Sequence, residues 1–335
     1  MKTVIVGGIL LVLVIIGCSN TDDVVGAGIQ GEWKLVFESQ DQTYYQGLHF
    51  VDINNGWVVG DSGVIVHTTD GGFSWDAQQS GTLVSLKTVF FVNVQRGWVG
   101  GGGNSVGRTT DGGATWIWEH PAGEPRRTFM ALSFVNENTG WVVDNFGGIL
   151  HTEDGGRTWL PQASGTTWAI TAVQFIDSKE GWATATNRVV LHTTDGGSSW
   201  TTQILDTVNS GSGVTAIYSD VFFLNRSRGW IATNVMASSI MNPMAFVVAT
   251  SNAGKTWSRQ LTPEENGLTS LEFVNENCGW AGSFGGILLT TNGGNSWEYH
   301  LRKKDGELIV DLCFVDESHG WALTFLGSIY RYQAQ

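Results

Sequence analysis

Four aspartates stand at the same place in a repeated motif and are the residues of this chain best suited to acid–base or calcium chemistry. Asp70, Asp111 and Asp154 lie 41 and 43 residues apart, and Asp195 follows 41 residues later. Carboxylates act as general acids, general bases or calcium ligands when several of them meet at one site. The regular spacing instead distributes them over separate structural units, so we predict that they stabilise turns and have no catalytic role.

Three histidines, His67, His151 and His192, each precede one of these aspartates by three residues and suggest a metal site. A metal ion binds histidine nitrogens at about 2 Å, which would require the three rings to converge. Their equivalent positions in separate copies of the motif place them apart. No phosphate-binding or metalloprotease motif occurs elsewhere in the chain. We therefore predict no catalytic residue, no metal and no cofactor.

The motif around the aspartates has the form Thr-x-Asp-Gly-Gly-x-Ser/Thr-Trp and resembles the Asp-box, in which carboxylate and hydroxyl groups hydrogen-bond a tight turn. Two further copies carry an asparagine, which keeps an acceptor oxygen but has no charge. The six pairs of turn residue and tryptophan are Asp70 and Trp75, Asp111 and Trp116, Asp154 and Trp159, Asp195 and Trp200, Asn252 and Trp257, and Asn292 and Trp297.

A second repeat, the dipeptide Gly-Trp, recurs every 41 to 50 residues and indicates the elements that must position the boxes. Before each copy come an aliphatic residue, a phenylalanine two positions later and an Asp or Asn after another two. This alternation is typical of a strand that ends in a turn. The period matches one four-stranded blade of a β-propeller, which takes about 40–50 residues. The seven copies begin at Gly56, Gly97, Gly140, Gly181, Gly229, Gly279 and Gly320.

The repeats predict an all-β fold, a seven-bladed β-propeller of four-stranded antiparallel blades over residues 31–335. In each blade, strand A carries the phenylalanine, strand B carries the Gly-Trp, strand C leads to the box and strand D follows it. No box follows the seventh Gly-Trp, but residues 31–37 resemble a strand D, with Trp33 in the place of the box tryptophan. We predict that this N-terminal strand completes the last blade and closes the ring.

The first 17 residues have the features of an export signal. Lys2 precedes an apolar stretch over residues 3–16, too short for a spanning helix of about 20 residues. The stretch ends at Gly17-Cys18, which resembles the lipobox of bacterial lipoproteins; the alternatives are an ordinary signal peptide or a membrane anchor. We expect lipidation of Cys18, a tether over residues 18–30, and an exported lipoprotein anchored to a membrane and facing the periplasm or the cell exterior.

The net charge limits the classes of partner that the protein can bind, and the cysteine content limits the disulfides that it can form. The formal net charge of −13 argues against nucleic-acid binding, which needs clustered lysine and arginine. Besides Cys18 the chain holds Cys278 and Cys313, which export would allow to form a disulfide; two unpaired thiols are the alternative.

The B–C loops and the D–A loops are predicted to share one face, opposite the boxes, which we call the loop face. Binding residues concentrate on loops held by a rigid scaffold, so the loop face is the candidate binding surface. Blade 5 is expected to extend it with long loops at residues 206–220 and 234–245. Aromatic and basic side chains there suit protein partners, and the alternative for each is local packing or a solvated loop. The candidates are Trp118, Phe146, Phe284, Phe325, Arg126, Arg127, Arg302, Lys303 and Lys304.

The paired motifs, Phe-Val-Asp/Asn before Gly-Trp and then Thr-Asp-Gly-Gly-x-Ser/Thr-Trp, resemble the photosystem II assembly and stability factors of the Ycf48/HCF136 family and their relatives in non-photosynthetic bacteria. The resemblance covers residues 31–335. It implies a non-catalytic propeller that binds membrane-protein assembly intermediates through a basic face, with the five basic loop residues as counterparts of that face. We expect a monomer that binds protein partners.

The alternative function is that of an Asp-box glycoside hydrolase or a glycan-binding propeller, because sialidases and some glucanases are built from similar blades. Sialidases start with a Phe/Tyr-Arg-Ile-Pro segment, which does not occur here. Two carboxylates about 5–9.5 Å apart on the loop face would favour a hydrolase.

Overall fold

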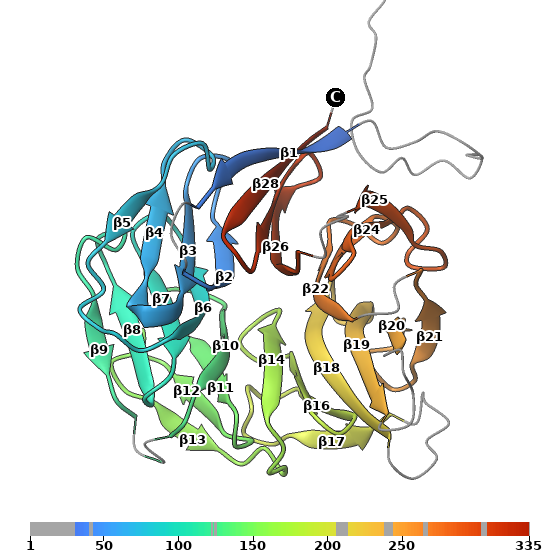
Figure 1. The fold of residues 1–335 in the computed structure, drawn as a ribbon. Coiled ribbons are helices and arrows are strands. Elements are labelled where there is room, and N and C mark those ends of the chain that lie inside the picture. Colours follow the sequence, from blue (N-terminus) through green and yellow to red (C-terminus); the bar gives the residue numbers. More distant parts are fainter. Residues whose placement is uncertain are drawn as a thin grey trace, which may run out of the picture.

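The computed structural model describes residues 31–39, 43–121, 123, 126–205, 214–237, 244–263, 267–302 and 307–334. Within these residues, 28 strands form seven four-stranded antiparallel sheets around a common axis (Figure 1), which confirms the predicted seven-bladed β-propeller. The described part contains one short 3-10 helix, Asp61–Gly63, and none of these residues forms a membrane-spanning helix.

The strands follow one another around the ring in sequence order, with strand A of each blade at the centre (Figure 1). Blade 1 comprises β2 (Tyr45–Phe50), β3 (Gly56–Gly60), β4 (Ile65–Thr68) and β5 (Asp76–Gln78), and blade 2 comprises β6 (Leu86–Phe91), β7 (Gly97–Gly101), β8 (Ser105–Thr109) and β9 (Ile117–Glu119). Blade 3 comprises β10 (Phe129–Phe134), β11 (Gly140–Asp144), β12 (Ile149–Thr152) and β13 (Leu160–Gln162), and blade 4 comprises β14 (Ile170–Phe175), β15 (Gly181–Ala185), β16 (Val189–Thr193) and β17 (Thr201–Ile204). Blade 5 comprises β18 (Val214–Phe223), β19 (Gly229–Ala237), β20 (Met244–Thr250) and β21 (Ser258–Leu261), and blade 6 comprises β22 (Leu268–Phe273), β23 (Gly279–Ser283), β24 (Gly286–Thr290) and β25 (Glu298–Arg302).

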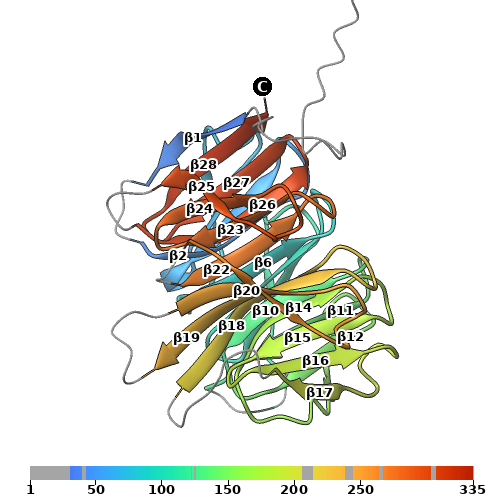
Figure 2. The same cartoon turned by 90° about the vertical axis from the view of Figure 1, so that its right-hand side faces the viewer.

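Blade 7 joins the two ends of the chain. It comprises β26 (Ile309–Asp316), β27 (His319–Thr324), β28 (Ser328–Ala334) and β1 (Gly31–Glu38). β1 lies alongside β28 in both views (Figure 1, Figure 2), with Trp33 opposite Tyr332 and Phe37 opposite Ile329. Trp33 meets the Phe314 ring edge-on at a centroid distance of 5.7 Å, as box tryptophans do in other blades. The predicted closure by the N-terminal strand is confirmed, and it leaves no open strand edge between the first and last blades.

The Gly-Trp repeat packs neighbouring blades against each other. The tryptophan of one blade stacks on the strand A phenylalanine of the next, as Trp57 does on Phe91 with ring centroids 3.6 Å apart. The glycine is needed because the phenylalanine of its own blade lies against it: a Cβ atom on Gly56 would be 2.5 Å from the Phe50 ring. Each dipeptide therefore fixes a contact within its blade and a contact to the next blade.

Each Asp-box is a closed hydrogen-bond network within one turn. Asp154 accepts hydrogen bonds from the backbone N–H of Thr158 at 2.9 Å, from its hydroxyl at 2.7 Å, and from the Thr152 hydroxyl at 2.9 Å. Although slight burial opposes it, these hydrogen bonds lower the pKa of Asp154 to about 2. In a copy without the carboxylate, Asn252 accepts from the N–H of Thr256 at 2.9 Å and donates to its hydroxyl at 2.8 Å.

Replacing Asp154 with alanine is expected to lower the free energy of unfolding by about 1–3 kcal/mol, because the turn donors lose their acceptor. Asp154→Asn is the matched control and should retain most of the stability, since Asn252 makes the equivalent bonds. Urea denaturation of the two variants measures the difference. An alanine variant as stable as the wild type would contradict the structural role of the box.

Blade 5 differs from the loop-rich unit expected for it. Much of the range expected to form loops is strand, because β18 and β19 pair from Val214 opposite Ala237 down to Phe223 opposite Gly229. Tyr218 belongs to this ladder and is fully buried. The enlargement of blade 5 therefore lengthens its strands; residues 206–213 and 238–243 lie outside the described residues.

Cys313 is a free, buried thiol, so no disulfide joins it to Cys278. Its Sγ atom accepts a hydrogen bond from the backbone N–H of Phe50 at 3.3 Å, which links blade 7 to blade 1. Burial raises the pKa of the Cys313 thiol well above its usual range, so this group is a packing element and not a reactive thiolate.

Candidate functional site

The loop face forms as predicted, because the B–C and D–A loops hydrogen-bond to one another. The N–H of Asp61 in a B–C loop donates to the carbonyl of Tyr44 in a D–A loop at 2.9 Å. The N–H of Asn145 donates to the carbonyl of Thr128 at 3.1 Å in the same way. The box turns pack instead on the A–B turns, which places the boxes on the opposite rim of the propeller: Gly71 N–H donates to the Asn54 carbonyl.

Large apolar side chains project from the loop face. The predicted Phe146 and Phe284 are about half exposed, at 49% and 44% of their surface. Phe325 is less exposed and stacks on Tyr44, with ring centroids 4.6 Å apart. Further exposed side chains that the sequence analysis did not assign to a site are Tyr44, Leu83, Trp168 and Leu326. Trp168 stands apart in the sequence because, like Trp118, it belongs to neither tryptophan repeat.

The two neighbouring arginines of the loop between β9 and β10 differ in their surroundings. Arg126 is exposed. Arg127 is largely covered, and its Nε atom lies 3.0 Å from Oδ2 of Asp144, a fully buried carboxylate. The same carboxylate accepts the N–H of Phe146 at 2.7 Å, so the ion pair holds the B–C turn that presents this ring. The charge of Arg127 is therefore already neutralised within the protein.

The remaining candidates of the sequence analysis fall into three groups. Trp118 is half-buried and donates from Nε1 to the carbonyl of Ser80 at 2.7 Å, so it packs between blades. Arg302, at the end of β25, is exposed with its guanidinium 4.4 Å from the Tyr299 ring centroid. Cys18, Lys303 and Lys304 lie outside the described residues.

The strands A enclose a central channel of about 420 Å³, and three residues with carboxyl groups are among those that line it. Asp311 of blade 7 accepts the backbone N–H of Leu48 in blade 1 at 2.8 Å. Asp220 of blade 5 accepts the N–H of Leu271 in blade 6, also at 2.8 Å. The third group, Glu272, has no hydrogen bond from its side chain to the described residues. The first two carboxyls thus join neighbouring blades at the centre of the ring.

Confinement in the channel shifts the protonation of these groups. Burial raises the pKa of Asp220 to about 6, although backbone hydrogen bonds oppose the shift. Burial, together with the charge of Asp220, raises the pKa of Asp311 to about 7. Burial and then the charges of these two aspartates raise the pKa of Glu272 well above its usual range. The sequence carries a faint signal for them, since acidic residues stand in strands that are otherwise apolar or neutral.

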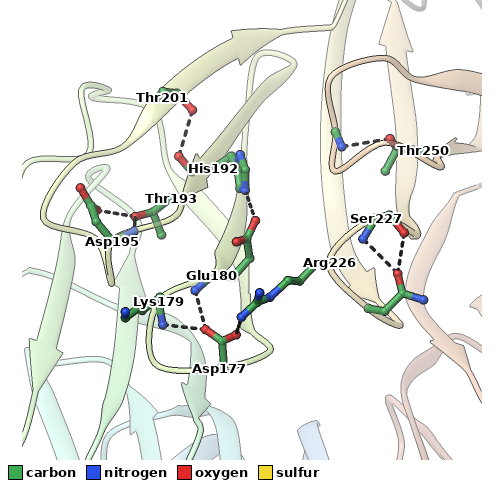
Figure 3. A network of polar contacts seen from close by, with 12 residues as sticks. Asp177, Lys179, Glu180, His192, Thr193, Asp195, Thr201, Arg226, Ser227 and Thr250 are labelled. Carbon is green, nitrogen blue, oxygen red and sulfur yellow. Dashed lines mark hydrogen bonds and ion pairs between the residues drawn. The ribbon is translucent and has the colours of Figure 1, made fainter.

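The three histidines of the repeat are packing residues. His67, His151 and His192 each stack on the Gly-Trp tryptophan of their own blade, with centroid distances of 4.5, 4.8 and 4.9 Å. Figure 3 shows His192 hydrogen-bonded to Glu180 near the box of blade 4. His67 and His151 belong to the strands C of blades 1 and 3. In the same view Asp177 meets Arg226 of blade 5 at 2.6 Å and thereby links two blades along the rim. No group of His, Cys, Asp or Glu within the described ranges could hold a metal ion.

Comparison with known families establishes the relationship of this chain. The family model described as photosynthesis system II assembly factor YCF48 matches residues 27–117, 79–164, 117–219 and 163–263. The chain belongs to the YCF48 family. Overlapping matches are expected for a repeated blade, and they confirm the resemblance drawn from the box and Gly-Trp motifs.

Individual YCF48 proteins are similar to this chain in sequence or in fold. The photosystem II assembly lipoprotein Ycf48 of Prochlorococcus marinus (strain MIT 9312) is 37% identical over 68 residues, 20% of this chain and 19% of that protein. The match thus spans about a fifth of this relative. The solved structure of YCF48 bound to D1 peptide superposes with a TM-score of 0.73 at 19% identity, covering 90% of this chain and 97% of that one.

The fold is also shared with an enzyme. A GH74 enzyme from Niastella koreensis superposes with a TM-score of 0.68 at 14% identity, covering 89% of this chain and 53% of that one. At such low identities a structural match shows the fold alone.

Proposed function

We propose that this chain is a non-catalytic, protein-binding assembly factor that acts at a membrane surface, as YCF48 proteins do for photosystem II. The observation that carries the proposal is the membership in the YCF48 family. An exported lipoprotein is supported by the lipobox-like segment at Cys18 and by the similarity to a protein named as an assembly lipoprotein.

The loop face is the surface that we propose for the partner. Exposed aromatic side chains at Phe146, Trp168 and Phe284 offer contact area at a small cost in side-chain entropy, which is typical of binding hot spots. Arg126 and Arg302 add exposed guanidinium groups that can form paired hydrogen bonds to partner carboxylates. The partner class is a segment of a membrane protein under assembly, in keeping with a solved YCF48 that holds a D1 peptide.

The proposal requires that loop-face substitutions weaken partner capture without unfolding the protein. We expect a triple change of Phe146, Trp168 and Phe284 to serine to lower capture at least about tenfold, because hot-spot residues contribute about 2 kcal/mol or more each. Charge reversal at Arg126, Arg302, Lys303 and Lys304 should also lower it. Arg127 is excluded, since reversing its charge would set two carboxylates against each other at Asp144.

Crosslinking of the lipidated protein in its native membrane, followed by mass spectrometry of the captured proteins, measures the effect. The matched control changes Ile117 and Leu160 to serine, because both are exposed apolar residues at the start of a strand D, directly after a box and away from the loop face. Undiminished capture by the loop-face variants would contradict the proposal. Turnover of a glycoside by the purified protein at an enzyme-like rate would support the hydrolase alternative instead.

A further inference from the structure

The chain enters the propeller on the rim that carries the boxes. β1 starts at Gly31, which pairs with Ala334 at the end of β28, and Figure 1 shows the C-terminal end of β28 beside the start of β1. The N–H of Ala334 donates to the carbonyl of Ser318, in the A–B turn of blade 7. Because A–B turns and box turns share one rim, the tether over residues 18–30 joins the molecule there, opposite the loop face.

The length of the tether limits which surface can approach the membrane. Cys18 and Gly31 are 13 residues apart. This segment spans no more than about 45 Å when fully extended, and a flexible chain of that length averages roughly 20 Å end to end. If Cys18 carries the lipid, as the proposed function states, the box rim next to Gly31 is held near the membrane surface.

The same rim carries an apolar patch in the blades next to this point, which we call the rim patch. It consists of Ile53, Phe73 and Val94, which are 41%, 57% and 43% exposed. The repeat shows that these residues are exceptional. The positions equivalent to Ile53 and Val94, three residues before Gly-Trp, are polar or charged in the other blades: Glu137, Ser178, Arg226, Glu276 and Glu317.

Contacts connect the rim patch to the strand that the tether enters. The N–H of Gly71 donates to the Asn54 carbonyl at 2.9 Å, so the box turn that holds Phe73 packs on the A–B turn that holds Ile53. The guanidinium of Arg331 lies 5.3 Å from the centroid of the Phe73 ring. Arg331 itself belongs to β28 and pairs with Lys34 of β1. Ile53 and Phe73 of the rim patch therefore adjoin blade 7, in which β1 begins, and Val94 lies on the same rim in blade 2.

We propose that the rim patch rests in the lipid interface of the membrane to which the chain is anchored, so that the loop face points away from the bilayer. Burial of exposed aromatic and aliphatic side chains among lipid headgroups is favourable and scales with apolar area. Three side chains are too few to bind a membrane alone, so the patch orients a protein that the lipid anchor holds. With a net charge of −13, the protein suits a zwitterionic surface better than an anionic one.

The proposal is tested by depth-dependent fluorescence quenching in the full chain. Val94→Cys and Phe284→Cys are labelled with an environment-sensitive fluorophore; the two sites are matched in exposure, at 43% and 44%, and lie on opposite faces. The native Cys313 is buried and should react poorly. The lipidated protein is reconstituted into phosphatidylcholine vesicles that contain brominated phosphatidylcholine. We expect about threefold stronger quenching at position 94, because interfacial side chains lie roughly 5–10 Å into the headgroup region.

The outcomes separate the orientation from the anchor. Preferential quenching at position 94, lost when Ile53 and Phe73 are changed to glutamate, supports the proposal. Equal quenching at both sites, or stronger quenching at position 284, contradicts the proposed orientation. If the protein still floats with the vesicles in that case, the lipid anchor is supported although the orientation is not. Failure to float with the vesicles overturns the anchor of the proposed function and the orientation with it.

Discussion

A Trp33→Ala variant is expected to lose about 3–5 kcal/mol of folding stability, the range for truncating a buried tryptophan. Trp33 is 8% exposed, and its ring centroid lies 5.6 Å from that of Trp280 and 5.7 Å from that of Phe314. Trp33 thus packs β1 onto the rest of blade 7 through Phe314 and packs blade 7 onto blade 6 through Trp280. Because no box turn precedes it, blade 7 depends on this side chain more than other blades depend on their box tryptophans.

Urea denaturation followed by tryptophan fluorescence measures the loss, with Leu35→Ala as the matched control. Leu35 lies on the same strand but is 50% exposed, so its truncation should cost well under the loss at Trp33. Equal destabilisation by the two substitutions would show that β1 pairs through its backbone alone. An unchanged midpoint for Trp33→Ala would contradict closure by the N-terminal strand.

A Glu272→Gln variant is expected to be more stable than the wild type at pH 8 by about 1–3 kcal/mol, and equal to it near pH 5. This is the usual free-energy cost of a buried polar group that has no hydrogen-bond partner, and the substitution removes that cost. Its pKa is raised in the folded chain, so the folded protein binds this proton more tightly than the unfolded chain does. The stabilisation from the bound proton is present at low pH and is lost as pH rises through the folded pKa.

The neutral amide has a partner that the carboxylate lacks. At the equivalent position of blade 4, Gln174 bonds both the N–H and the carbonyl of Phe223 in the next blade. Glutamine at position 272 can do the same with the backbone of Phe314. Other groups in the channel also make the stability depend on pH. Burial lowers the pKa of His49 to about 4, and this shift has the opposite effect, because it makes the folded protein more stable as pH rises.

Comparing the variant with the wild type at each pH cancels the contribution of groups that do not interact with Glu272, so the difference reports Glu272 together with its coupling to Asp220 and Asp311. Thermal unfolding at pH 5, 6, 7 and 8 gives the difference directly. A stability difference that does not depend on pH would mean that Glu272 has the same pKa in the folded and unfolded chains. A variant that is less stable at pH 8 would mean that the carboxylate makes a favourable contact there.

The architecture could be predicted from the sequence, because the interactions that build a blade are short-range and repeated. An Asp-box closes its turn within eight residues, and the Gly-Trp dipeptide records a close contact with a phenylalanine six residues earlier. Seven copies of the Gly-Trp repeat with the same spacing of flanking residues predict seven equivalent blades. The absent seventh box and the strand-like residues 31–37 then identified Trp33 as the closing element, and β1 occupies that place.

Which side chains are exposed and unpaired depends on contacts between distant strands and could not be predicted from the sequence. Arg127 looked like its neighbour Arg126 but is paired with Asp144. Burial in the channel raises the pKa of Asp311, and the charge of Asp220 in blade 5 adds to this shift, although the hydrogen bond from Leu48, 263 positions away, opposes it. Exposure and protonation depend on the dielectric surroundings that distant strands create, whereas a turn depends on its own residues. The repeated scaffold could therefore be predicted from the sequence, apart from the longer strands of blade 5, whereas the charges and rings available on its surfaces could not.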